Sequence, residues 1–409
     1  MNISAFIAKR IAFNRQSSFL NFIIRLAIAA TLISVAAMII TVALTNGFQY
    51  AISQKVFSFW GDIRVQHYEA SKAAIAEETP IEKNDTVLQI LRDNKEIKTI
   101  QAFATKNAII KGSESIEGVL LKGVEKNYDF SNIKNFLQEG NWLHFPDSGY
   151  SNEINLSTYT ANRLKLKVND KLLIYFIQPD GSHRVRSMTV AGLFKTGIED
   201  YDKLYAIADI KMIQRLNNWE ENQIGGYEIF IKDYHKLDTV SNQIAYQLPS
   251  AWNSKTIKEI YPYIFDWLDL QNTTIGIAII IIMIVATLNL VTCLIVLVLD
   301  RTKMIGILKA VGSPNSSIQK IFLYNVTIIT VSGILFGNLL AFLFCWLQQR
   351  YGLITLPEDA YFISTAVVKL SWWQVLAVDA GTLLICFLVL IIPTLIIRKI
   401  QPARAMQFS

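Results

Sequence analysis

The sequence predicts a membrane protein with four transmembrane α-helices and a large exported α+β domain inserted between the first and second helices. Of its 409 residues, 52% are hydrophobic and only 18% are charged, and the apolar residues gather in four uninterrupted stretches. These stretches are Leu26–Phe48, Ile275–Leu299, Ile321–Leu347 and Val375–Ile397. Because a helix rises about 1.5 Å per residue, each stretch can cross a hydrocarbon core of roughly 30 Å. Basic residues flank the stretches, and the segment between the first two carries the strand and helix patterns of a folded domain.

The four stretches divide the chain into an ordered series of segments. Residues 1–20 are expected to form a cytoplasmic interfacial helix, because apolar residues such as Ile3 and Ile7 interleave with Lys9 and Arg10. A disordered tail is the alternative. The segments that follow are the first helix at 21–48, the exported α+β domain at 49–270, the second helix at 271–299, a cytoplasmic helix and loop at 300–317, the third helix at 318–347, a short exported loop at 348–373, the fourth helix at 374–397 and a cytoplasmic tail at 398–409.

Basic residues indicate the orientation of the chain, because Lys and Arg in short loops are retained on the cytoplasmic side. The segments 1–25, 300–320 and 398–409 hold eleven Lys and Arg against the single acid Asp300. The segment 49–270 holds 26 basic and 29 acidic residues. Both termini are therefore predicted in the cytoplasm. The net charge of +6 lies at membrane edges and forms no stripe on a soluble domain, which argues against nucleic-acid binding.

The predicted spans hold two features that bear on export. Ala27 and Ala29 match a small-residue cleavage pattern, but they lie at the beginning of the first apolar run, so this run is predicted to be an uncleaved span rather than a secretory signal. All three cysteines, Cys293, Cys345 and Cys386, lie inside predicted spans. The exported domain can therefore form no disulfide framework and no metal site built on Cys pairs.

Residues 49–270 show the short patterns of an α+β fold. Strands are predicted at Ile100–Thr105, Asn107–Lys111, Glu117–Gly123, Lys171–Ile177 and Arg184–Leu193. Helices are predicted at Thr86–Asp93, Thr158–Leu164, Ile210–Leu216 and Leu237–Leu248. The turn residues at 178–181, Gln-Pro-Asp-Gly, predict a hairpin between the last two strands. Residues 70–85 are predicted to be a solvated connection into the first helix of the domain.

The sequence predicts no catalytic residues and no metal site. The four histidines lie far apart in the sequence and none has a second ligand at metal-site spacing. Glu199, Asp200 and Asp202 are expected to lie in a solvated turn-forming loop, with cation binding or acid/base chemistry as the alternative. The chain also lacks the phosphate-binding pattern G-x-x-x-x-G-K-[ST]. Energy for any active transport is therefore expected from another chain, and no cofactor is expected on this one.

The segment DRTKMIGILKAVGSP, at residues 300–314, predicts a short cytoplasmic helix with an apolar stripe. The stripe consists of Met304, Ile307, Leu308 and Val311 at i, i+3, i+4 and i+7, and the basic residues around it are Arg301, Lys303 and Lys309. Gly312 supplies the C-terminal stop. A helix this short is marginal alone, so its apolar face requires a partner surface. The segment is therefore either an interfacial loop or a helix that docks into a cytosolic motor subunit.

Polar and small residues within the spans predict helix packing. Gly333 and Gly337 form a G-x-x-x-G pattern, which allows two helices to approach closely. Asn289 is the deepest polar residue and is expected to hydrogen-bond a neighbouring helix. Asp379 is expected near the outer rim, beside interfacial tryptophans.

Several motifs resemble the type VII ABC permeases, which include the lipoprotein-releasing permeases LolC and LolE, the exporter MacB and the division protein FtsX. The stretches LTNGF at 44–48 and GDIRV at 61–65 resemble the lipoprotein-releasing group. Residues 154–176 resemble its A…L-x-L-x-x-G-D segment, with Asn169 where glycine is usual. Residues 189–206 are similar to its V-x-G-x-F-x-x-G-x-x-x-Y-D signature. The signature residues are Gly192, Phe194, Gly197, Tyr201 and Asp202.

The resemblance implies a MacB-like periplasmic core between the first two helices, in a permease of the bacterial inner membrane that hydrolyses no ATP itself. It implies that a LolD-like ATPase dimer uses ATP and Mg, that a second permease protomer completes a homodimer or heterodimer, and that triacylated lipoproteins pass from membrane lipid to a LolA-like periplasmic carrier. The segment 301–312 then corresponds to the coupling helix, with Met304 where an acidic residue is usual. Candidate residues of a lipoprotein cavity are Met38, Val42, Phe48, Ile282 and Leu288.

Two alternative functions share this topology. An FtsX-like mechanotransmitter would regulate a periplasmic hydrolase without moving a substrate, and a MacB-like permease would export small molecules or peptides. A sensor would instead have fewer spans and a cytosolic signalling domain. The resemblance leaves open whether the protomer has a LolC-like or LolE-like role.

Overall fold

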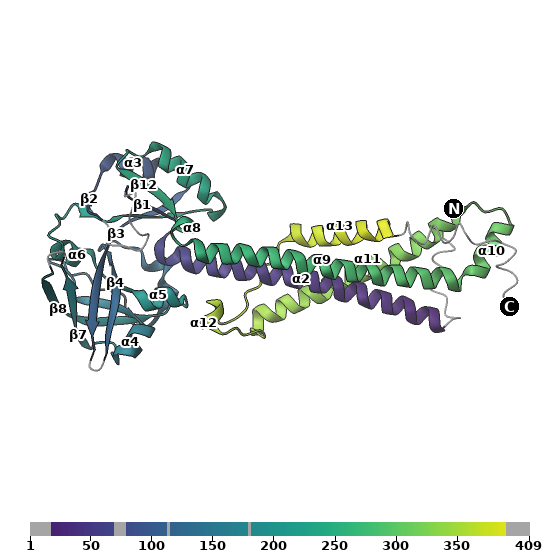
Figure 1. Cartoon of the computed structure of the whole chain (residues 1–409), viewed down its shortest axis with the longest axis horizontal. Helices are drawn as coiled ribbons and strands as arrows, with labels where there is room; N and C mark the ends of the chain where they lie inside the picture. The colour runs from purple at the N-terminus through teal and green to yellow at the C-terminus, as the bar shows by residue number, and fades with distance from the viewer. Residues whose placement is uncertain (1–17, 69–78, 113–114, 179–180, 390–409) are drawn as a thin grey trace. The chain divides into compact units, whose positions relative to one another are not determined.

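The computed structural model describes residues 18–68, 79–112, 115–178 and 181–389 of the chain (Figure 1). The chain forms two compact units. A helical unit comprises residues 1–50, 268–355 and 365–409, and an α+β unit comprises residues 51–267 and 356–364. The second unit thus contains a short segment, Leu356–Ser364, whose neighbours on both sides along the chain belong to the first.

Three helices are long and apolar enough to cross a membrane among the residues that the structure describes. They belong to α2 (Ser18–Trp60), α9 (Pro262–Asp300) and α11 (Asn315–Tyr351). The fourth apolar stretch begins as α13 (Trp372–Val389), and its remaining residues lie outside the described part of the chain, as does the predicted interfacial helix at 1–20 except for its last residues, which begin α2. The fourth span therefore stays a prediction.

Two of the long helices extend well beyond their apolar stretches. The helix α2 continues from Phe48 to Trp60, and α9 begins at Pro262, ahead of Ile275. Both extensions consist of residues compatible with a helix, although their polar content places them outside a hydrophobic window. The predicted boundary of the exported domain at residue 49 therefore falls inside α2. The hydrophobicity of the sequence drops at this point, but the helix continues to Trp60.

The helical unit is held together by apolar contacts between its helices. One cluster joins Val35, Met38 and Ile39 of α2 to Ile334 and Ala341 of α11, with contributions from α13. A second cluster joins α2, α9, α11 and α13. Because the hydrophobic effect does not act between helices within a bilayer, van der Waals packing and polar contacts of this kind supply the association.

The α+β unit is built on a ten-stranded mixed sheet. The strand order is β12-β1-β11-β3-β4-β9-β6-β8-β5, and β7 pairs with both β3 and β8. The strands are β1 (Ile63–His67), β3 (Ile97–Lys111), β4 (Ile116–Val124), β5 (Leu137–Gly140), β6 (Glu153–Ser157), β7 (Lys171–Ile177), β8 (His183–Phe194), β9 (Tyr205–Asp209), β11 (Gly226–Ile231) and β12 (Trp252–Thr256). A separate pair consists of β2 (Ile81–Glu82) and β10 (Gln223–Ile224).

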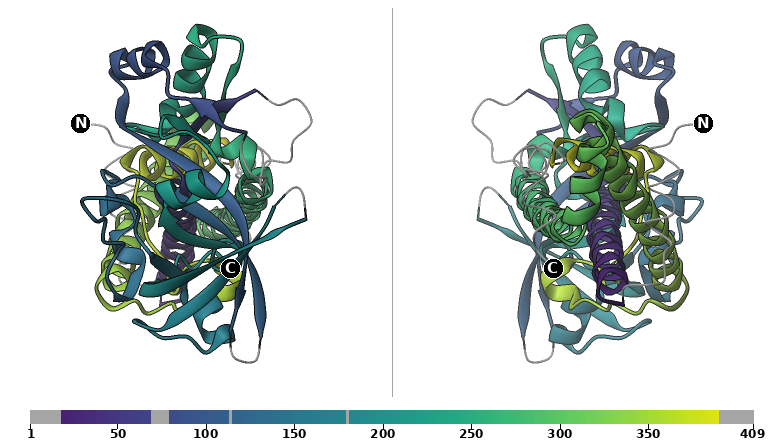
Figure 2. Two further views of the ribbon diagram at one scale, coloured as in Figure 1. Left: turned by 90° about the vertical axis from the view of Figure 1, so that its left-hand side faces the viewer. Right: turned by 90° about the vertical axis from the view of Figure 1, so that its right-hand side faces the viewer.

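Short helices connect these strands. They are α3 (Asp85–Asp93), α4 (Thr158–Leu164), α5 (Glu199–Leu204), α6 (Ile210–Leu216), α7 (Leu237–Gln247), α8 (Ile257–Ile260) and α12 (Glu358–Tyr361), with 3-10 turns η1 (Phe130–Asn132), η2 (Lys134–Phe136) and η3 (Tyr234–Lys236). The antiparallel pairs β3–β4 and β7–β8 can be followed in Figure 2. The predicted α+β class of this domain is therefore confirmed, and so is the hairpin around residues 178–181.

One strand prediction was wrong in its division. The two strands expected on either side of Lys106 are a single strand, β3, which pairs continuously with β4 through Lys106 and Leu121. Lys106 is almost fully buried, so it does not mark a solvent-exposed break. A lysine is a poor signal for a strand end, because its side chain can be accommodated in a sheet when its charge finds a partner.

Asn169 explains one departure from the permease pattern. Its φ is +73°, a left-handed conformation that glycine adopts freely and that asparagine tolerates better than most residues. Its backbone N–H donates to the carbonyl oxygen of Val190 at 2.8 Å, which joins the turn after α4 to β8. The asparagine therefore preserves the turn that the usual glycine allows.

Candidate functional site

The short helix predicted at residues 301–311 is present as α10 (Thr302–Ala310), and its cytoplasmic location stays a prediction. It ends as predicted at Gly312, whose φ is +91°, and Pro314 then precedes α11. The chain therefore turns sharply between α10 and the next long helix.

The predicted single apolar stripe of α10 is divided between two faces. Met304 and Leu308 pack against a cluster formed by α9, α11 and the fully buried Ile305. Ile307 and Val311 are 56% and 81% exposed. The four residues of the stripe therefore have two environments, because α10 packs against α9 and α11 with Met304 and Leu308 and leaves Ile307 and Val311 exposed. We call the exposed residues Lys303, Ile307, Ala310 and Val311, at i, i+4, i+7 and i+8, the α10 tip.

The remaining residues of the predicted docking segment lie around this tip. Arg301 pairs with the neighbouring Asp300, with 3.4 Å between Nε and Oδ2. Lys309 is half-buried near the end of the helix, and Lys303 is an exposed member of the tip itself. Basic charge therefore accompanies the apolar tip, as an acidic or mixed partner surface would require.

The signature residues Gly192, Phe194 and Tyr201 build the interior of the α+β unit. A Cβ on Gly192 would lie 2.5 Å from the carbonyl oxygen of Asn141, so β8 and the chain after β5 approach too closely for a side chain. Phe194 and Tyr201 are fully buried, and both rings contact Phe59 of α2. These residues therefore position α2 against the sheet.

Asp202 corrects the expectation of a solvated acidic loop. Its carboxylate is buried and accepts hydrogen bonds from the Thr196 N–H and hydroxyl, both at 2.8 Å, and from the Gly197 N–H at 3.0 Å. Burial raises the pKa of Asp202, while the hydrogen bonds from Thr196 and Gly197 act in the opposite direction. Glu199 and Asp200 do remain exposed, on α5. Of the three acidic residues, Asp202 therefore stabilises the loop from inside the fold, whereas Glu199 and Asp200 lie on the surface.

The loop that Asp202 shapes contacts the segment Leu356–Ser364, which we call the α12 loop. Glu358 of this loop lies between two lysines, with Oε2 at 2.5 Å from Lys195 Nζ and Oε1 at 3.7 Å from Lys55 Nζ. Lys55 also donates to the carbonyl oxygen of Phe362 at 2.7 Å. No sequence pattern predicted this cluster, because its members come from α2, the end of β8 and a loop far along the chain.

The LTNGF motif marks a tight junction inside the helical unit. A Cβ on Gly47 would lie only 1.9 Å from the carbonyl oxygen of Val367. The side chains of Asn46 and Gln374 hydrogen-bond to one another, and the Lys369 N–H donates to the Ala43 carbonyl oxygen at 3.0 Å. The motif therefore holds the segment before α13 against α2.

The G-x-x-x-G residues of α11 also face α2. A Cβ on Gly333 would meet Thr31 at 2.7 Å, and one on Gly337 would meet the Leu32 carbonyl oxygen at 2.9 Å. This packing is within one protomer. Asn289 is half-buried on α9. Polar contacts join α11 to α13, where Asn338 donates to Asp379 at 2.9 Å and the Thr330 hydroxyl lies 3.0 Å from the Cys386 sulfur.

The candidate cavity residues have different surroundings. Met38 is fully buried in the apolar cluster between α2 and α11, so its assignment to a cavity surface was wrong for this protomer. Ile282 packs at the edge of the same cluster, and Phe48 is buried. Val42 is half-buried, whereas Leu288 is 61% exposed. Leu288 belongs to an exposed apolar face of α9 with helical periodicity. That face consists of Ile277, Ile280, Ile281, Ile284, Val285 and Leu288.

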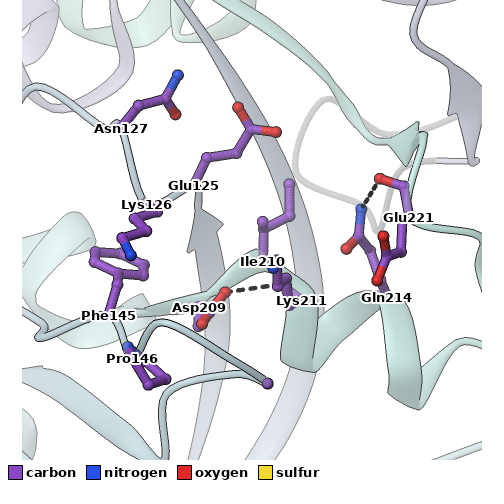
Figure 3. A pocket seen from close by; sticks show the side chains of 11 residues that line it. Glu125, Lys126, Asn127, Phe145, Pro146, Asp209, Ile210, Lys211, Gln214 and Glu221 are labelled. Carbon is purple, nitrogen blue, oxygen red and sulfur yellow. Dashed lines mark hydrogen bonds between the residues drawn. The ribbon is translucent and has the colours of Figure 1, made fainter.

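A cavity of about 340 Å³ opens in the α+β unit beside α6 (Figure 3). Phe145 and Ile210 supply part of its apolar wall, and Asp209 and Gln214 are buried polar residues in it. The Asp209 carboxylate accepts hydrogen bonds from the N–H groups of Lys211 at 2.9 Å and Ser151 at 2.8 Å. These polar groups therefore fix the end of β9 and the start of α6.

Three long apolar helices among the described residues, an α+β unit inserted along the chain between the first two, and a short helix with exposed apolar residues are features of a membrane protein with several spans. Residues 26–256 match the MacB-like periplasmic core domain, and residues 276–402 match the FtsX-like permease C-terminal domain. The chain belongs to the family of proteins with a MacB-like periplasmic core domain.

Curated relatives match nearly the whole chain. The lipoprotein-releasing system transmembrane protein LolE of Haemophilus influenzae is 25% identical over 421 residues, which cover 99% of each chain. The lipoprotein-releasing system transmembrane protein LolC of Xylella fastidiosa is 21% identical over 410 residues, which cover 97% of this chain and 96% of the relative. The periplasmic region of MacB from Actinobacillus actinomycetemcomitans covers 49% of this chain at 10% identity, with a TM-score of 0.35.

Proposed function

We propose that the chain is the permease subunit of an ABC transporter that extracts lipoproteins from the outer leaflet of the bacterial inner membrane and passes them to a periplasmic carrier. The observation that carries this proposal is the similarity to lipoprotein-releasing relatives over nearly the full length of the chain. The order of elements along the chain, with a MacB-like periplasmic core followed by further long apolar helices, supports it.

The α10 tip is the proposed docking site for the motor. An exposed apolar pair, Ile307 and Val311, with Lys303 beside it, suits a groove on a cytosolic ATPase subunit of the LolD kind. ATP and Mg are used by that subunit, while this chain supplies no phosphate-binding loop. Met304, where relatives of this type commonly carry an acid, packs against the protomer itself. The position at which this chain lacks the acidic residue is therefore not part of the α10 tip.

The substrate chemistry explains why a motor is required. Removing an acyl chain from lipid costs about 0.8 kcal/mol per CH₂ group, so a triacylated lipoprotein needs both an apolar route and an external energy source. The exposed apolar face of α9, which includes Ile284 and Leu288, is the surface of this protomer that we assign to such a route. A second permease protomer would close the route on its other side.

Force reaches the periplasmic core through continuous helices. The helix α2 has no break between Ser18 and Trp60, and its last turn is anchored in the α+β unit, where Lys122 Nζ donates to the Phe59 carbonyl oxygen at 2.5 Å. At the start of α9, the hydroxyls of Tyr261 and Tyr205 lie 2.9 Å apart. We propose that a movement of either helix is passed to the sheet through these attachments.

The proposed topology places both termini and α10 in the cytoplasm and the α+β unit in the periplasm. It includes α13 extended to residue 397 as a fourth span and residues 1–20 as an interfacial helix, in agreement with the distribution of basic residues.

Reconstitution tests the function directly. The full-length chain and its ATPase are placed in proteoliposomes that carry a triacylated lipoprotein, and soluble lipoprotein is measured with the carrier present, before and after ATP is added. Release that requires ATP, the motor and the carrier supports the proposal. ATP turnover without release, accompanied by activation of a periplasmic hydrolase or by export of a small molecule, would assign the chain to an FtsX-like or MacB-like role.

A further inference from the structure

We propose that the α12 loop is an electrostatic latch, in which Glu358 ties the connection between α11 and α13 to the periplasmic core. This inference rests on the proposed function for its role in transport, but the contact itself is independent of that function. The latch gives the core a third attachment to the membrane helices, besides α2 and α9.

The first observation is where the loop belongs. Leu356–Ser364 packs as part of the α+β unit, although residues 355 and 365 on its two sides belong to the helical unit. The loop is closed at its base, because the Leu356 N–H donates to the Ser364 carbonyl oxygen at 3.0 Å. A closed loop with both ends joined to α11 and α13 can pass a displacement of these helices to whatever it is docked on.

The second observation is the chemistry of the contact. The carboxylate of Glu358 bridges Lys195 and Lys55, so one acid serves two cations from different elements of the core. Lys55 holds the loop a second time through the Phe362 carbonyl oxygen at 2.7 Å. The Phe362 ring meets Trp267 edge-on, with 5.9 Å between the ring centroids. The loop thus contacts the core through a carboxylate, a carbonyl oxygen and an aromatic ring, and Lys55 contacts the first two of these groups.

The third observation is the shape of the receiving surface. Gly197 has a φ of +74°, and a Cβ at this position would lie 2.4 Å from Lys55 Nζ and 2.5 Å from Glu358 Oε1. The Gly197 N–H donates to the buried carboxylate of Asp202, which fixes the turn. Two residues of the signature, Gly197 and Asp202, therefore shape the surface on which the lysines meet Glu358.

The strength of the contact suits a reversible latch. Glu358 is 26% exposed and Lys195 is 41% exposed, and ion pairs of this exposure are individually weak. Breaking both charge contacts with Glu358→Gln is expected to raise the hydrogen-exchange rate of the loop by about three- to tenfold, while leaving the domain folded. A latch of this strength can open and close during a transport cycle.

The experiment measures the contact and its consequence separately. Full-length wild type, Glu358→Gln, Gly197→Ala and the reversed pair Lys195→Glu/Glu358→Lys are compared in lipid nanodiscs by hydrogen exchange of residues 356–364, and in proteoliposomes with the ATPase by ATP-dependent lipoprotein release. Glu96→Gln serves as the matched control, because Glu96 pairs with Lys236 at 2.7 Å on the surface of the same unit and lies outside the α12 loop and its partners.

The latch predicts faster exchange in the loop and about three- to tenfold slower release for Glu358→Gln and Gly197→Ala, with both values partly restored in the reversed pair and unchanged in Glu96→Gln. Unchanged exchange in Glu358→Gln and Gly197→Ala would overturn the contact. Faster exchange with normal release would overturn its role in coupling and leave the proposed function intact. If wild type releases no lipoprotein, the proposed function fails, whereas the exchange measurement still decides whether the loop is latched.

Discussion

Nζ of Lys122 lies 2.8 Å from the carboxylate of Glu228 in the interior of the α+β unit, where the two side chains are 1% and 0% exposed. The same ammonium group donates to the Phe59 carbonyl oxygen at the end of α2. A buried pair of this kind adds little net stability over an apolar pair, because both charges have lost their hydration. Here the pair fixes the relative positions of three elements, because Lys122 of β4 contacts both Glu228 of β11 and the last turn of α2.

Removing one member of this pair is therefore expected to be strongly destabilising. Lys122→Met removes the ammonium group that pairs with the buried Glu228 carboxylate, and we expect a loss of about 3 kcal/mol in the free energy of unfolding of the α+β unit. The double variant Lys122→Met/Glu228→Gln should recover part of this loss. The measurement is urea-dependent hydrogen exchange of β4 and β11 in the full-length protein. Equal losses in the single and double variants would show that the charge of Glu228 is not the cause.

The stability of the α+β unit should depend on pH through Asp62. Burial raises the pKa of Asp62 to about 6 from its ordinary value of 3.8, although its carboxylate accepts a hydrogen bond from the Ile231 N–H at 2.7 Å. The folded state thus binds this proton more tightly than the unfolded state does. The contribution is fully present below about pH 4 and is lost as the pH rises through 6. Its upper limit is about 3 kcal/mol, from 1.36 kcal/mol per pKa unit.

Asp62→Asn isolates this contribution, because an amide oxygen can still accept from Ile231 and carries no charge. We expect the variant to be more stable than wild type at pH 7.5 and equal to it near pH 4. Unfolding is followed by hydrogen exchange of β11 and β1 at both pH values. A constant difference at the two pH values would mean that Asp62 is not the titrating group in this range.

Gly47 is expected to be the glycine least tolerant of substitution in the helical unit. Gly47→Ala places a Cβ against backbone atoms of Val367, which cannot rotate away, so the segment before α13 must move from α2. Overpacking of this kind is expected to destabilise the unit by about 1–3 kcal/mol. Gly276→Ala on α9 is the matched control, because nothing lies within 4 Å of its added Cβ. The melting temperature of the purified protein in detergent should fall only for Gly47→Ala, and a fall of equal size in Gly276→Ala would point to a general effect of losing glycine.

The sequence predicted the elements whose signals are local. Apolar length predicted the helices, turn residues predicted the β7–β8 hairpin, and Gly312 predicted the end of α10. Contacts between distant residues left no such signal. Glu358 and Lys195 are 163 residues apart, and each alone resembles an ordinary surface charge. Asp202 was predicted to be solvent-exposed because its acidic neighbours suggest a loop. Its carboxylate is instead buried, where the N–H groups of Thr196 and Gly197 donate hydrogen bonds to it.

Variants of the neighbouring residues Ile307 and Leu308 test separately whether α10 binds the ATPase and whether it contributes to folding. Ile307 is 56% exposed at the α10 tip, whereas Leu308 packs against α9 and α11. Ile307→Asp is therefore expected to weaken binding of the ATPase by at least about tenfold, the effect of losing about 1.4 kcal/mol at the centre of an interface, without changing the melting temperature of the permease. Leu308→Asp should lower both the affinity for the ATPase and the melting temperature of the permease, because a charge would be buried beside Ile305. Co-purification with the ATPase and thermal unfolding in detergent measure the two properties. If Ile307→Asp retains the motor at wild-type levels, the exposed tip of α10 is not the docking surface.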